Sequence, residues 1–188
     1  MSTIASKPLT IEEFDKLHLP QDRNWELRNG ELVEVTFPLI IHKDLQVRIF
    51  ELFRDAFPNA HVLTEYPFQI PETNDKRSAD VAMTTRQRGG EARKKGILVG
   101  TPEVVVEVLS PSNSMAQLRR DRRVYFEHGT LLFLVVDPDD STIEVYVKGE
   151  KSALTLGVED TLEIAVFGER KTIPVKAVFA GITVPESA

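Results

Sequence analysis

Two acidic residues stand in segments that otherwise have the composition of buried strands. Glu107 lies in TPEVVVEVLSPS, residues 101–112, and Asp80 begins the short strand predicted at ADVAM within SADVAMTT. An ionised carboxylate in such a strand is costly unless it is paired, hydrogen-bonded or bound to a metal. If the two strands are neighbours, Asp80 and Glu107 can converge on one divalent cation. Carboxylate, backbone and water oxygens suit Mg²⁺ or Mn²⁺ rather than Zn²⁺.

A structural ion pair is the alternative for Glu107, with Arg77 as the candidate partner, because structural networks also bury charges. Side chains alternate across a strand, so Glu107 shares one face with Val105 and Leu109. The opposite face is entirely valine. The residues alone leave metal binding and ion pairing open.

The elements that must position these acids follow from turn signals and hydrophobic periodicity. Thr10 and Glu13 form a capping box that opens a short helix through about Leu17. The dipeptide NG at 29–30 separates two alternating segments, which indicates a tight hairpin. Apolar residues recur at helical spacing over 41–57, which predicts a long amphipathic helix lying on a sheet.

The rest of the chain reads as strands with one further helix. HVLTEYPFQI and SADVAMTT are extended, and a basic stretch containing glycines follows them. The run 104–109 has the character of a strand buried on both faces, as does LLFLVVD. A helix begins at Asn113 or Ser114 and continues to about His128. Shorter antiparallel strands follow in STIEVYV, ALTLG and TLEIAVF.

This order predicts a mixed α/β fold, with a central mixed sheet and helices packed on it, as one domain over 1–188. There is no cysteine, which favours a cytoplasmic location, and no apolar run approaches the roughly 18 residues of a membrane span. The net charge is −6, against the usual composition of a nucleic-acid binder. Basic residues nonetheless cluster over 86–95 and 119–123. They either contact phosphates or form a solvated loop in the glycine-containing first stretch and a solvated helix face in the second.

The ordered motifs RSADVAM, TPEVVVEVLSPS, a helix containing Tyr125, and LLFLVVDP resemble the Uma-two family. These are restriction-endonuclease-like proteins of the PD-(D/E)xK nuclease superfamily. WELRNGELVEV, His42 and TIEVY extend the likeness over nearly the whole chain. The resemblance implies a central mixed sheet flanked by helices, with an N-terminal hairpin and extra C-terminal strands. It also implies a Mg²⁺-dependent nuclease site with Asp80 and Glu107 as metal ligands. Glu26 would line the same site, unless it is a surface charge of the hairpin.

One expected residue is missing. The superfamily lysine normally stands two residues after the glutamate, where this chain has Leu109, or, in Uma-two proteins, four residues before a tyrosine, where it has Asp121. Gln117 replaces the acid expected one turn earlier. Arg120 or Arg122 could act as electrostatic stabilisers, but arginine is unsuited to general-base work. Tyr125 either contacts phosphate or packs its helix, and Asp121→Lys is expected to raise activity.

The resemblance therefore implies a divalent-metal-dependent endonuclease that hydrolyses nucleic-acid phosphodiester bonds, with DNA as the expected substrate. It is also compatible with a homodimer. The alternative is a catalytically degenerate nuclease fold that serves as a nucleic-acid-binding or protein-interaction module. Asp80 and Glu107 favour the enzyme, whereas Leu109, Asp121 and the acidic composition favour the degenerate module.

Overall fold

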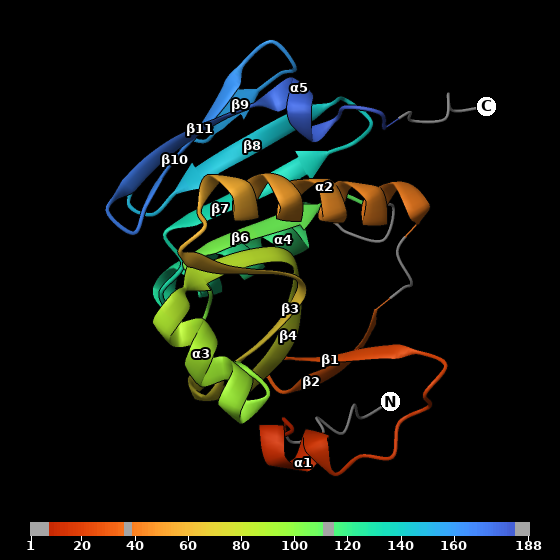
Figure 1. Ribbon diagram of the computed structural model, residues 1–188. Helices are drawn as coiled ribbons and strands as arrows, with labels where there is room; N and C mark the ends of the chain where they lie inside the picture. The colour runs from red at the N-terminus through yellow and green to blue at the C-terminus, as the bar shows by residue number, and fades with distance from the viewer. Residues whose placement is uncertain (1–7, 36–38, 111–114, 183–188) are drawn as a thin grey trace, which may run out of the picture.

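The protein is described by a computed structural model over residues 8–35, 39–110 and 115–182. Most strands form one mixed sheet. In chain order the strands are β1 (Asn24–Arg28), β2 (Glu31–Val35), β3 (Ala60–Ile70), β4 (Asp75–Thr85), β5 (Leu98–Val99), β6 (Val104–Val108), β7 (Leu132–Asp137), β8 (Thr142–Val147), β9 (Leu154–Leu156), β10 (Thr161–Val166) and β11 (Glu169–Pro174). The large sheet has the order β2-β1-β4-β6-β7-β8-β9, and β3 joins it along β4 with β5 beside it. Strands β10 and β11 form a separate small sheet (Figure 1).

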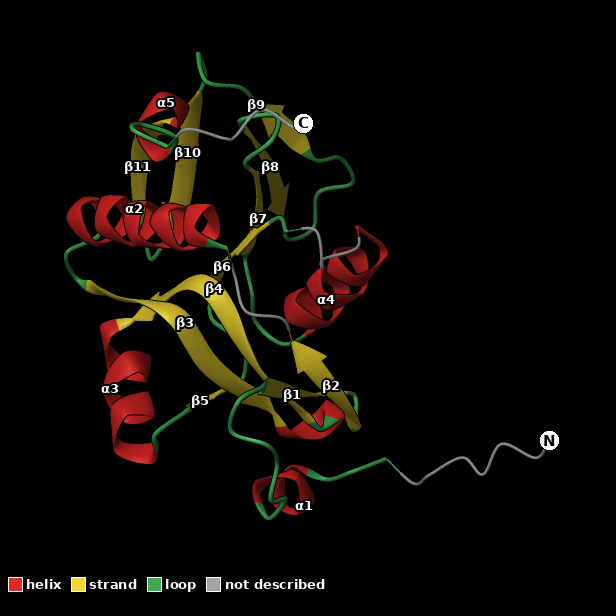
Figure 2. Ribbon diagram, turned by 90° about the vertical axis from the view of Figure 1, so that its right-hand side faces the viewer, coloured by secondary structure: helices red, strands yellow, loops and turns green. Residues whose placement is uncertain are grey.

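Two helices cover opposite sides of the central strands. The helices are α1 (Ile11–Asp15), α2 (Ile40–Ala56), α3 (Arg86–Lys95), α4 (Met115–Glu127) and α5 (Val175–Val178), with a 3₁₀ turn, η1, at Pro71–Thr73. Figure 2 shows α2 and α4 on either side of β6 and β7. Each helix covers a separate apolar cluster, so the central strands are buried on both faces. No helix in the described ranges combines the length and apolar character needed to span a membrane.

The N-terminal predictions are confirmed. Thr10 accepts a hydrogen bond from the Glu13 amide, and the Glu13 side chain accepts one from the Thr10 amide, as a capping box requires. Strands β1 and β2 pair through the two-residue loop Asn29-Gly30, whose φ angles are 49° and 76°. Positive φ at both positions is the geometry of the tight turn that the asparagine–glycine pair favours.

The alternation predicted for β6 is also confirmed. Val105 packs in the cluster that α4 covers, and Leu109 lies against the same cluster. The even-numbered valines of β6 belong to the cluster under α2. Strand β6 runs parallel to β7, and α4 forms the crossover between them. A parallel pair covered on both faces explains why both segments read as continuous apolar runs.

The basic stretch over 86–95 is helical, which corrects the expectation of a loop there. Thr85 caps α3 by accepting a hydrogen bond from the Arg88 amide at 3.3 Å. Gly89 lies so close to His61 that a Cβ at position 89 would stand 2.2 Å from His61 Cγ. The glycine that suggested a loop is therefore required by packing between α3 and β3.

We expect Gly89→Ala to destabilise the protein by about 1–3 kcal/mol, because the buried His61 ring would have to move. Gly90→Ala is the matched control, since no atom lies within 4 Å of its added Cβ. It should be neutral or stabilise the helix by up to about 1 kcal/mol. Urea unfolding of the two variants measures the difference. Equal midpoints would show that the contact with His61 does not constrain α3.

The C-terminal region contains more structure than the sequence indicated. Strand β11 pairs with β10, and α5 follows β11 directly. Neither element was expected, because half of the residues of β11 are charged and α5 is a single turn. Asn113 and Ser114, the predicted caps of the fourth helix, lie outside the described residues.

Candidate active site

The predicted acids lie where β4 changes its partner strand. Strand β4 pairs with β1 at Lys76 and with β6 from Val81 onward. Between these points, Glu26 Oε1 accepts the Ser78 amide at 3.0 Å, and Asp80 Oδ2 accepts the Val108 amide at 2.7 Å. Buried backbone N–H groups need acceptors. The two carboxylates supply them at a fork in the sheet.

Asp80 and Glu107 stand opposite each other at this fork. The antiparallel register pairs Val81 with Val106 and Ala82 with Val105. Continued by one residue, it places Asp80 opposite Glu107. The expectation of neighbouring strands is confirmed, but Asp80 is in the middle of an eleven-residue strand and not at its start.

Helix α2 holds the Asp80 carboxylate from the other side. His42 Nε2 lies 3.0 Å from Asp80 Oδ1, and Gln46 Nε2 donates to the same oxygen at 2.8 Å. An ionised carboxylate only accepts hydrogen bonds, so Nε2 is the donor atom of His42. The i, i+4 spacing places His42 and Gln46 on one helix face. Sequence reasoning missed Gln46, although that spacing from His42 was a usable signal.

Glu107 has a different environment. In the described part of the chain, no side chain or amide donates a hydrogen bond to its carboxylate, and no cation forms a salt bridge with it. Burial raises the pKa of Glu107 well above its usual value, and the charge of Asp80 raises it further. Like charges directly opposite on paired strands repel each other. This carboxylate is therefore poorly satisfied by the protein alone.

Arg77 pairs with other acids, so the alternative of an ion pair between Arg77 and Glu107 is wrong. The Arg77 guanidinium bonds to Asp75 and to Asp121 in a buried network. Gln117 also donates to Asp121, at 2.8 Å. Position 121, where a lysine was expected, thus holds the buried counter-ion of an arginine.

Arg28 is a basic residue whose charge acts on Glu107. Its charge lowers the pKa of Glu107, whereas the acids around Glu107 raise it. Its Nε donates to Glu26 Oε2 at 2.8 Å, and its Nη1 lies 3.9 Å from Asp121 Oδ2. The sequence carried a signal for Arg28, because residues 26 and 28 share one face of a strand. The family pattern places the expected cation on the helix after β6, and Arg28 lies outside that pattern.

Of the other residues predicted for the site, Arg120 and Arg122 make contacts elsewhere, whereas the Tyr125 ring lies against Arg77 beside the site. The exposed Arg120 donates to Gln117, and Arg122 lies over the Tyr146 ring, 3.8 Å from its centroid. Tyr125 is 2% exposed and packs edge-on against Phe68. Burial raises the pKa of the Tyr125 hydroxyl well above its usual value. These are packing and surface contacts, whereas Glu26, Asp80 and Glu107 are brought together.

The donor set suits a hard divalent cation. The Asp80 carboxylate accepts three hydrogen bonds and keeps lone-pair capacity on Oδ2, and both Glu107 oxygens are available. Mg²⁺ commonly uses one or two carboxylates and completes its octahedron with water and substrate oxygens. Among the described residues, no cluster of three or more acidic, histidine or cysteine side chains could enclose a metal. Asp80 and Glu107 are the two residues of this fork that could hold such a cation, with water and substrate oxygens as its other ligands.

The fold is similar to that of a solved protein. A crystal structure described as a "putative nuclease belonging to DUF820" from Anabaena variabilis ATCC 29413 superposes with a TM-score of 0.79. The two chains are 18% identical, and the match covers 94% of this chain and 100% of that one. The chain therefore has the mixed α/β fold class of that structure.

A family model agrees with this class. The model described as "Uma2: Putative restriction endonuclease" matches residues 11–182, so the chain belongs to the Uma2 family. The resemblance seen in the sequence motifs is confirmed. Nucleic acid is the substrate class that a nuclease family implies. No curated protein matches the chain.

Proposed function

We propose that the protein is a divalent-metal-dependent nuclease that hydrolyses phosphodiester bonds of DNA. The observation that carries this proposal is the opposition of Asp80 and Glu107 at the β4–β6 fork, with Glu107 lacking any donor in the described chain. A carboxylate left in this state is stabilised by a cation, because a positive charge offsets both its burial and the repulsion from Asp80.

Each side chain around the fork has a role in this proposal. Asp80 and Glu107 would hold Mg²⁺ or Mn²⁺, while His42 and Gln46 orient the Asp80 carboxylate. The bound ion would polarise the scissile phosphate and lower the pKa of its water. Arg28 would place a fixed positive charge beside the phosphate, where charge develops, and Glu26 holds the guanidinium in place.

The degenerate module remains the second candidate, and Asp121 is the observation that favours it. Position 121 holds an acid that neutralises the buried Arg77, in place of the expected lysine. Arg28 can supply positive charge but not a general base, since arginine stays protonated. The degenerate protein would bind nucleic acid and leave it intact.

The decisive experiment incubates the purified protein with supercoiled, linear and single-stranded DNA in Mg²⁺, Mn²⁺ or chelator. We expect cleavage that requires the metal. Asp80→Asn keeps the shape of the side chain but removes its charge, so cleavage should fall at least about tenfold, the effect of losing 1.4 kcal/mol of transition-state stabilisation. If the wild type and Asp80→Asn bind DNA equally well and neither cleaves it in Mg²⁺ or Mn²⁺, the protein is the degenerate module instead.

A further inference from the structure

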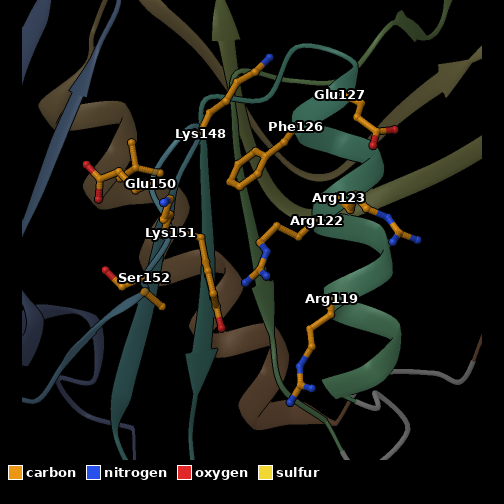
Figure 3. Close-up of a pocket in the computed structure, with 12 residues that line it drawn as sticks. Arg119, Arg122, Arg123, Phe126, Glu127, Lys148, Glu150, Lys151 and Ser152 are labelled. Carbon is orange, nitrogen blue, oxygen red and sulfur yellow. The ribbon is translucent and has the colours of Figure 1, made fainter.

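Helix α4 forms one wall of a groove, on the side of the helix away from the buried Asp121. This groove, of about 690 Å³, lies between α4 and the loop 148–153 that joins β8 to β9. This volume is within the range of ligand-binding clefts. Figure 3 shows Arg119 and Arg122 extending from α4 toward the β8 side of the groove.

The groove is strongly basic although the protein is acidic overall. Its basic residues come from both walls and are Arg119, Arg122, Arg123, Lys148 and Lys151. Glu127 and Glu150 are the acids that line it. Within the described part of the chain, none of the five basic side chains forms a salt bridge with a carboxylate. The groove therefore carries more positive than negative charge, in a protein of net charge −6.

Arg122 is already ordered in this groove. Its guanidinium lies over the Tyr146 ring at 3.8 Å from the centroid, on the strand that forms the opposite wall. A guanidinium carries five N–H donors, so a guanidinium held by one aromatic residue keeps donors for an anion. Because the side chain is held before binding, less conformational entropy is lost when it meets an anion.

We propose that this groove binds the sugar-phosphate backbone of a nucleic acid strand. The phosphates bound there are different from the phosphate that is cleaved at the candidate active site. The inference rests on the proposed nuclease function for the identity of its ligand. Helix α4 connects the two places, since Asp121 faces Arg77 and Arg28 beside the candidate site while Arg119 and Arg122 face the groove. Cations on separate walls suit the repeated charges of a phosphate backbone.

Fluorescence anisotropy with labelled single-stranded and duplex DNA, in chelator, tests binding without cleavage. Each phosphate contact contributes a slope of about −0.9 to the dependence of log affinity on log salt for a duplex. Arg119→Ala/Lys151→Ala should therefore flatten the slope by about 2. Affinity near 0.15 M salt should fall about 25-fold, since each of the two lost contacts costs about fivefold on the same relation.

Arg120→Ala is the matched control, because Arg120 is exposed on the same helix but does not line the groove. It should leave the slope nearly unchanged. An equal loss in Arg119→Ala and Arg120→Ala would overturn the proposal in favour of a general charge effect. Polyglutamate that competes as well as DNA would also overturn it and indicate an acidic protein partner. If the groove variants weaken DNA binding as expected but the protein does not cleave DNA in Mg²⁺ or Mn²⁺, the proposed role of the groove stands. Only the proposed nuclease function is then refuted.

Discussion

Glu107→Gln is expected to stabilise the metal-free protein while it abolishes the response to metal. The charged form of Glu107 is disfavoured by burial and by Asp80, so the neutral amide removes an unfavourable charge from the fold. A metal contributes several kcal/mol of transition-state stabilisation. Cleavage should therefore fall at least about 100-fold. Thermal unfolding with and without Mg²⁺, together with a cleavage assay, measures both effects.

The pH dependence gives this prediction a specific sign. The pKa of Glu107 is raised in the folded chain, whereas a glutamate in an unfolded chain has a pKa of about 4.3. The stability that the bound proton confers is present below about pH 4.3 and is lost as the pH rises through the raised pKa. Mg²⁺ should restore stability at neutral pH in the wild type alone. If the Glu107→Gln variant kept the wild-type pH profile and full activity, Glu107 would not be part of the site.

Asp121→Lys is expected to destabilise the protein, not to activate it. The substitution places a second cation against Arg77, which is 4% exposed at its side chain. Breaking a buried ion pair typically costs about 3–5 kcal/mol, and like charges add to this cost. A chain of this length then loses roughly 10 °C in its melting temperature. Asp75 still pairs with Arg77, so the loss should lie toward the lower end.

Asp121→Asn separates charge from shape, because the amide oxygen can still accept a hydrogen bond from Arg77. It should lose less stability than the lysine variant. Urea unfolding of both variants provides the comparison. A lysine variant as stable as the wild type and faster in cleavage would contradict the buried network and restore the expectation drawn from the family pattern.

The sequence by itself determined the main elements of the fold and the acids of the candidate site. The capping box, the asparagine–glycine turn and the period of α2 are local signals, because each depends on contacts between residues close in the chain. The apolar runs of β6 and β7 likewise reported burial on both faces. Glu107 stood out because a charge in such a run needs a partner.

Only the tertiary structure decided which groups meet. The fork in β4 brings residues from β1 and β6 together across more than fifty positions of sequence, and no local pattern encodes it. The partner of Arg77 is Asp121 rather than Glu107, since α4 packs over that end of the sheet. Gly89 lies in a stretch that was expected to be a loop. The close approach of His61 explains why a glycine stands at this position of a helix.

The charges of α4 also show what the sequence determines and what the tertiary structure decides. The arginines of α4 were visible as a cluster in the sequence, but their directions differ by about 100° per residue along a helix. Arg122 stacks on β8, Arg120 faces solvent and Asp121 is buried, although these residues are consecutive. Composition thus reported how much charge the helix carries. The packing of α4 against the sheet and the β8–β9 loop decided which of those charges line a groove, which stay in water and which neutralise a buried arginine.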